Sequence, residues 1–249
     1  VGKKHPYYVS SLKLVAESYS NLGDYQRSLE LNLECLTLYE KILGKEHQNY
    51  IGVLGNIANT YHYLGDYQKS LDLRLECLAL YEKILGKEHP YYLTSLNNLA
   101  ESYSILGDYQ RSLELHLECL ALREKILGKE HPDYARSLNN VAQAYSNLGD
   151  YQRALEWHLE CLDLYENLLG KEHPDYALSL NNVAASYSDL GNYQRALELN
   201  LECLALREKI IGKEHPDYAL SLSNVAASYS DLGDYQRSLE LHLECLALR

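Results

Sequence analysis

The sequence predicts an all-α protein built from six copies of one helix-turn-helix unit. Two motifs mark the repeat: Gly-Lys-Glu-His recurs at residues 44, 86, 128, 170 and 212, and Leu-Gly-Asp-Tyr keeps the same 42-residue spacing between Leu22 and Leu232. Between these marks, apolar residues recur at the spacing of an α-helix rather than of a strand. Self-similarity at a fixed period of this length is the signature of a solenoid.

The first helix of each unit, helix A, is best seen in the copy that begins at His131. Pro132 suits the first helical turn, where its missing N–H costs nothing, and Asp133 suits the positive end of the helix dipole. We expect the linker histidine to cap this helix. Its apolar positions continue to Leu148 and Gly149, where a glycine stop precedes an N-cap candidate, Asp150.

The second helix, helix B, is predicted from about Tyr151 to Leu169. It carries two apolar stripes. One stripe contains Ala154, Trp157, Cys161, Leu164 and Leu168, and the other contains Leu155, Leu159, Leu162 and Leu169. His158 and Tyr165 lie between the stripes, and acidic residues occupy the opposite side. A helix with two apolar stripes is suited to packing between its own partner and the next repeat.

The linkers between units are too short to separate domains, so we expect one domain over residues 1–249. The expected repeats are 5–46, 47–88, 89–130, 131–172, 173–214 and a truncated 215–249. Six units of 42 residues would need 252, three more than the 249 present, and the chain begins with Val1. We therefore expect an excerpt from a longer array.

Composition excludes several classes of function. The net charge of −12 and the pI near 5.3 argue against nucleic acid or an anionic membrane as partner. No apolar run reaches the roughly 20 residues of a membrane span, and no signal peptide begins the chain, so we expect a cytoplasmic protein. Phosphate-binding glycine loops and catalytic motifs are absent from the sequence. It therefore predicts neither an enzyme nor a bound cofactor.

Six cysteines fall one per repeat, from Cys35 to Cys245, at equivalent positions. Equivalent helices pack about 8–10 Å apart or more, too far for bridged Cα atoms, so disulfides are not expected. The His-Cys pairs at i,i+3 offer two ligands each, whereas a zinc site needs three or four. We interpret the cysteines as small packed residues and expect no metal site.

The repeat resembles the tetratricopeptide repeat (TPR), through Asn140-Val141-Ala142, Tyr145, Gly149, Tyr151, Ala154 and the small residue Cys161. Its 42-residue period with His-Pro-Asp linkers is similar to the repeats of kinesin light chains. The resemblance implies a right-handed α-solenoid superhelix whose concave wall is lined by the A helices. It also implies a scaffold for protein–protein interaction, although such arrays serve cargo adaptors, signalling ATPases and bacterial regulators alike.

Five asparagines form a series on helix A: Asn56, Asn98, Asn140, Asn182 and Asn224, with Leu14 in the first repeat. An amide offers both donors and an acceptor, so such a ladder can bind the backbone of an extended peptide. The equal alternative is structural, because buried amides usually form hydrogen bonds within the fold.

Other helix A positions vary between repeats and are expected to give the peptide-binding wall its specificity. Those we assign to the site are Asn97, Asn139, Asn181, Glu101, Arg136 and Gln143; Lys13, Glu17, Asn59, His62, Tyr63 and Asp189 are expected beside them. The wall is polar, and only Lys13 and Arg136 add positive charge. We expect a peptide of neutral or mildly basic character, and the net negative charge would steer basic ligands to it.

Two alternative functions stay open. The last helix B has apolar residues Leu239, Leu243 and Leu246 with no following repeat to cover them, which predicts head-to-tail self-association. The array is equally suited to be the sensor arm of a larger signalling protein.

Overall fold

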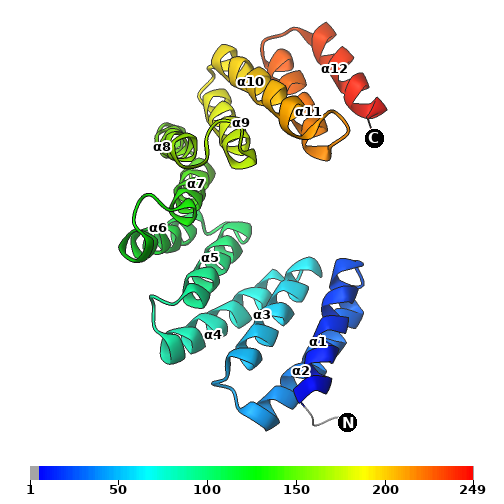
Figure 1. The fold of residues 1–249 in the computed structure, drawn as a ribbon, viewed down its shortest axis with the longest axis vertical. Helices are drawn as coiled ribbons and strands as arrows, with labels where there is room; N and C mark the ends of the chain where they lie inside the picture. Colours follow the sequence, from blue (N-terminus) through cyan, green and yellow to red (C-terminus); the bar gives the residue numbers. More distant parts are fainter. Residues whose placement is uncertain (1–5, 249) are drawn as a thin grey trace. The chain divides into compact units, whose positions relative to one another are not determined.

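A computed structural model describes residues 6–248 and contains twelve α-helices and no strand over that range (Figure 1). The first helices of the repeats are α1 (Pro6–Asn21), α3 (Gln48–Tyr63), α5 (Pro90–Ile105), α7 (Pro132–Asn147), α9 (Pro174–Asp189) and α11 (Pro216–Asp231). The second helices are α2 (Tyr25–Leu43), α4 (Tyr67–Leu85), α6 (Tyr109–Leu127), α8 (Tyr151–Leu169), α10 (Tyr193–Ile211) and α12 (Tyr235–Ala247). The predicted all-α repeat architecture is confirmed. Residues 1–5 and 249, which bound the first and last expected repeats, lie outside the described residues.

Helices begin directly after the residues that the sequence marks as caps, except that the expected cap of α1, His5, lies outside the described residues. His131 Nδ1 accepts a hydrogen bond from the backbone N–H of Asp133 at 3.1 Å, and the linker histidines of α3, α5, α9 and α11 do the same. Asp150 caps α8 by accepting from the N–H of Arg153 at 3.3 Å. Gly149, between the two helices, has φ of +79°, a conformation that a side chain disfavours. The predicted capping roles are therefore confirmed.

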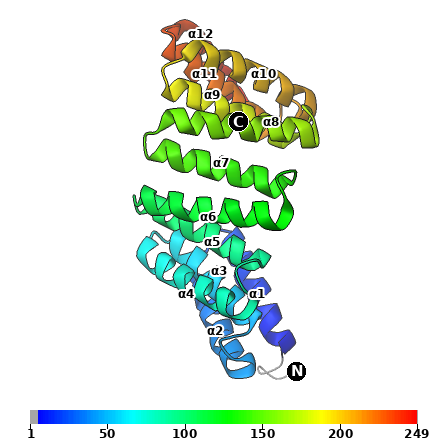
Figure 2. The same cartoon turned by 90° about the vertical axis from the view of Figure 1, so that its left-hand side faces the viewer.

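The chain divides into two compact units, residues 1–122 and 123–249, with the division inside α6. In the first unit each helix from α1 to α5 packs on the next, and α6 joins α5 in a core that includes Leu96, Leu115 and Cys119. In the second unit each helix from α7 to α12 packs on the next, as α7 and α8 show in Figure 2. Each unit is therefore a stack of helical hairpins. That the whole of 1–249 forms one domain stays a prediction.

All six cysteines are buried and unbridged, as predicted. The Sγ of Cys161 contacts the carbonyl oxygen of Ala135 at 3.2 Å, and Cys203 makes the same contact with Ala177. Burial raises the pKa of the Cys161 thiol to about 11. The Cys161 thiol is therefore a packing group and a poor nucleophile at neutral pH.

One prediction about helix B was wrong. Leu159 belongs to an expected apolar stripe but is 39% exposed, whereas His158 and Tyr165, predicted between the stripes, are only 5% and 6% exposed. The next repeat covers the region between the stripes and leaves the edge that holds Leu159 open. The buried strip of α8 is therefore centred on a polar residue.

Candidate functional site

Grooves run between consecutive A helices, with the helix B between them as the floor. We number each groove by the earlier of its two repeats. The first groove lies between α1 and α3, the second between α3 and α5, the fourth between α7 and α9, and the fifth between α9 and α11. Cavities of about 200, 160 and 260 Å³ open in the first, second and fifth grooves. Each of these grooves lies within one compact unit.

Three members of the asparagine ladder line these cavities. Asn56 lines the first and second, Asn98 the second, and Asn224 the fifth. Within the described part of the chain, their side-chain amides form no hydrogen bond. These three amides therefore present donors and an acceptor toward the groove.

Asn182 in the fourth groove is different. Its Nδ2 donates to the Oδ1 of Asn139 on the neighbouring A helix at 2.6 Å. A second bond links the same two helices, from Ser146 Oγ to Asp189 Oδ2 at 3.2 Å. Here the ladder residue joins two repeats, which is the structural role that the sequence left open.

The remaining predicted site residues are spread over different environments. Asn181 lines the fifth groove but is only 9% exposed, and its Oδ1 is buried without a hydrogen-bond partner. Asn97 and Asn140 are half-buried on the A helices, and Glu101 is exposed. Gln143 is also exposed and donates to Asn147 Oδ1 at 3.1 Å.

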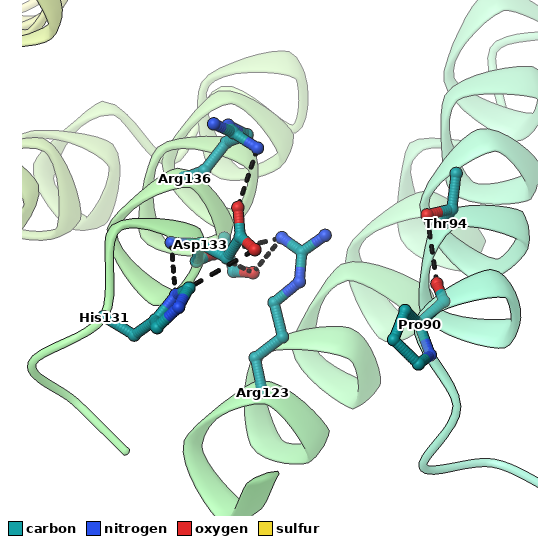
Figure 3. A network of polar contacts seen from close by, with 7 residues as sticks. Pro90, Thr94, Arg123, His131, Asp133 and Arg136 are labelled. Atoms are coloured by element: carbon teal, nitrogen blue, oxygen red, sulfur yellow. Dashed lines mark hydrogen bonds and ion pairs between the residues drawn. The ribbon is translucent and has the colours of Figure 1, made fainter. Parts of the chain in front are cut away.

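Arg136, expected to bring positive charge to the wall, is paired with a carboxylate of its own helix. Its Nη1 lies 2.8 Å from Asp133 Oδ1, as Figure 3 shows. The same first turn of α7 accepts a bond from Arg123, whose Nη1 contacts the Asp133 carbonyl oxygen at 3.1 Å. The charge of Arg136 is therefore largely balanced before any ligand arrives.

Sequence reasoning missed the groove floor. One position of helix B is polar and buried in every repeat from the first to the fifth. The residues are Asn32, Arg74, His116, His158 and Asn200. A polar residue recurring every 42 positions among apolar ones is a signal that could have revealed this position. We call it the floor position.

Three floor residues, Arg74, His158 and Asn200, bond to the following A helix, whereas Asn32 donates to Ser28 on its own helix. Asn200 Nδ2 donates to Ser228 Oγ at 2.9 Å, and His158 Nδ1 lies 2.7 Å from Ser186 Oγ. Burial lowers the pKa of His158 to about 4, so its imidazole is neutral at pH 7. Desolvation also lowers the pKa of Arg74, although the guanidinium keeps its charge in proteins.

Among the described residues, no group of three His, Cys, Asp or Glu side chains could hold a metal ion. None of the described helices has the length and apolar character needed to cross a membrane.

A family model of the tetratricopeptide repeat matches residues 7–83, 51–125, 94–167, 138–209 and 175–249. No curated protein matches the chain. A crystal structure of a kinesin-light-chain-like protein of Podosopora anserina, with nearly identical TPR-like repeats, is 30% identical. The alignment covers 82% of this chain and 97% of that chain, with a TM-score of 0.74.

Two further solved structures share the fold at lower identity. BtubC from P. vanneervenii is 21% identical, with 91% of this chain and 89% of that chain covered and a TM-score of 0.70. A signal transduction ATPase with a tetratricopeptide repeat sensor, from Pyrococcus horikoshii, is 16% identical, with 99% of this chain and 37% of that chain covered and a TM-score of 0.73. At these identities the likeness concerns the fold alone.

Proposed function

Because the chain belongs to the tetratricopeptide repeat family, whose members typically serve as protein-interaction scaffolds, we propose that it binds an extended peptide along its A-helix grooves. The observation that carries the proposal is the set of open ladder amides, Asn56, Asn98 and Asn224, each lining a groove. We propose a binding role without catalysis, in the cytoplasm, where six free buried thiols suit a reducing environment.

The chemistry of these amides fits a peptide backbone. A peptide backbone presents one donor and one acceptor per residue whatever its side chains. An asparagine amide can form hydrogen bonds with both. An extended peptide cannot satisfy these groups internally, so a spaced series of amides gains affinity without demanding a sequence. Sequence preference then comes from the polar groups around each amide, which differ from groove to groove.

The test is a triple replacement of the open amides, Asn56, Asn98 and Asn224, by Ala. Two backbone bonds per amide at about 0.5–1.5 kcal/mol each give several kcal/mol, enough to weaken a micromolar complex beyond detection. Peptides selected from a random display library on the parent chain are the probe, and fluorescence anisotropy gives Kd.

The matched control is Asn167→Ala. Asn167 is an exposed asparagine of α8 that bonds only to Asp163 on its own helix, at 3.2 Å. We expect the control to keep the parental Kd and both proteins to keep the parental circular dichroism spectrum. A triple variant that binds the selected peptides as tightly as the parent overturns the proposal.

Self-association through α12 is a second candidate, because one of its apolar residues is unusually open. Leu239 is 55% exposed, whereas its equivalents Leu155 and Leu197 in internal repeats are 7% and 6% exposed. Leu246 is 68% exposed, but Leu243 is weaker support, because its internal equivalent Leu201 is already 40% exposed. A second copy would cover Leu239.

Sedimentation velocity over a concentration series tests this candidate. If α12 mediates association, the parent sediments faster with rising concentration and Leu239→Asp stays monomeric. Leu201→Asp, at an exposed leucine on an internal helix, serves as the control. A parent that stays monomeric at high concentration rules the candidate out for this chain.

A further inference from the structure

The second groove differs from the others in two features of its walls and floor. Gly52 and Gly55 lie on α3 and line its cavity, where other repeats carry side chains such as Thr94 and Asn139. A Cβ added to either glycine would meet no atom within 4 Å, so packing does not require glycine there. Glycine also lowers helix propensity. These two residues therefore leave space in the groove, although they lower the stability of helix α3.

The floor of this cavity is a buried arginine. Arg74 on α4 is 9% exposed, and its Nη1 donates to Ser102 Oγ at 2.9 Å and to the carbonyl oxygen of Asn98. Its Nη2 donates to Asn59 Oδ1 at 3.1 Å. A guanidinium has five N–H donors, and the buried Nε of Arg74 has no hydrogen-bond partner.

The charge of Arg74 is also unpaired. All three of its acceptors are neutral, and it forms no ion pair with a carboxylate in the described part of the chain. Glu101 is the acidic residue that acts on it most strongly, but from the exposed face of α5 and without contact. A buried charge without a counter-charge is costly, and an anion entering the cavity would relieve that cost.

Folding does not demand a cation at the floor position. Asn32 and Asn200 fill it in the first and fifth repeats, and Asn200 makes the corresponding bond to the next A helix with a neutral amide. The arginine therefore occurs at the one described groove where two glycines also make room. The two ladder amides of this groove, Asn56 and Asn98, are donors on its opposite walls.

We propose that the second groove is an oxyanion site, in which Arg74, Asn56 and Asn98 bind one phosphate or carboxylate group of a ligand. The cavity of about 160 Å³ fits a group of that size, since a water occupies about 30 Å³ of liquid. Guanidinium and amide N–H groups match the lone pairs of such a group, and charge-assisted bonds are the stronger kind. The site does not depend on peptide binding, because a free anion suffices to occupy it.

Titration followed by ¹⁵N–¹H NMR tests the proposal on the whole chain. The reporters are the Nε–H of Arg74 and the backbone N–H groups of Gly52 and Gly55. Inorganic phosphate, acetate and chloride are added at matched ionic strength. We expect a saturable shift with phosphate or acetate that chloride does not give. A larger affinity for phosphate assigns the site to phosphorylated ligands, and a comparable or larger affinity for acetate assigns it to carboxylates.

Two variants separate the site from general salt effects. Arg74→Asn uses the residue of the first and fifth repeats, so the hairpin is expected to fold, and Arg74→His, the residue of the third and fourth, is a second choice. Either is expected to weaken anion binding by about tenfold or more, the size of a charge-assisted bond. Glu101→Gln is expected to tighten it, because one repelling charge is removed.

Shifts in the parent no larger than those with chloride would overturn the proposal, as would a Gly52 and Gly55 response that survives Arg74→Asn. The peptide proposal is judged independently, since its probe is a selected peptide and its variants carry an intact Arg74.

Discussion

The second and fourth grooves share one backbone design, and two of the positions at which they differ set the contacts of their ladder residues and floors. In the fourth groove, Asn139 holds the ladder residue Asn182, and the neutral His158 forms the floor. In the second groove, Gly55 takes the place of Asn139, and Arg74 forms the floor. The ladder amide Asn98 is consequently open, whereas Asn182 is engaged. A repeat array can thus keep its fold while single positions change whether a groove amide is engaged and whether the groove floor is cationic.

The asparagine ladder is therefore not uniform along the chain. Asn182 forms a hydrogen bond between helices, and Asn98 lines an open cavity, where a ligand role stays a proposal. Between these two grooves the difference goes with the residue at the position of Asn139 on the preceding A helix, one place upstream of the ladder. Asparagine at that position does not by itself engage the ladder, because Asn181 occupies it in the fifth groove, where Asn224 is open. The two grooves are expected to differ in stability and in pH dependence.

The largest expected difference is the acid sensitivity of the fourth groove. The folded pKa of His158 is about 4 against 6.5 for the free residue. Because the unfolded chain binds the proton more readily, the stability from this group is complete above pH 6.5 and is lost as pH falls toward 4. Between pH 7 and pH 5 the loss is about 2 kcal/mol. Urea unfolding at both pH values measures it.

The control for this prediction is His158→Asn, which places the residue of Asn200 at the same floor position. This variant loses the titrating group but keeps a donor for Ser186, so its free energy of unfolding is expected to fall about 2 kcal/mol less than that of the parent between pH 7 and pH 5. Carboxylates and exposed histidines are the same in both proteins, so their contributions cancel when the two losses of unfolding free energy are compared. Equal losses in the two proteins would show that His158 is protonated in the folded state.

Much of this fold could be predicted from the sequence because the repeat presents each local signal several times. The caps His131 and Asp150 and the turn glycine Gly149 are each determined by residues nearby in the chain, and all were predicted. The site was harder to predict from the sequence, because groove contacts join residues about 43 positions apart, as Asn139 and Asn182 do. Their engagement depends on side-chain geometry between helices. Arg74 could not be assigned to the groove from helix A alone, because it lies on helix B and is buried beneath the A helices.

The next effect in size concerns the two ladder residues. Asn182→Ala removes a 2.6 Å hydrogen bond and leaves Asn139 without its donor. The expected loss is about 0.5–1.5 kcal/mol in the free energy of unfolding. Asn98→Ala breaks no bond of the side-chain amide and gains helix propensity, so stability is expected to stay level or rise by about 0.5 kcal/mol. Urea denaturation at pH 7 compares them.

A double-mutant cycle identifies the cause of the Asn182 effect. If the bond to Asn139 is responsible, Asn139→Ala and the double variant show a coupling energy of about 0.5–1 kcal/mol. A loss of equal size in Asn98→Ala and Asn182→Ala would remove the distinction between the two grooves.

The smallest effect comes from giving the second groove the side chain of the fourth. Gly55→Asn restores the residue found at Asn139, and an added Cβ meets no atom within 4 Å, so the side chain has room to reach Asn98. Helix propensity contributes about 0.3 kcal/mol and the new hydrogen bond about 0.5 kcal/mol or more, so the free energy of unfolding is expected to rise by about 1 kcal/mol. In an Asn98→Ala background only the propensity gain should remain, and urea midpoints of the four proteins measure the difference. The same substitution should weaken anion and peptide binding, because it engages the amide that the open groove offers. A stabilisation that persists unchanged without Asn98 would mean that the asparagine pair does not form in the second groove.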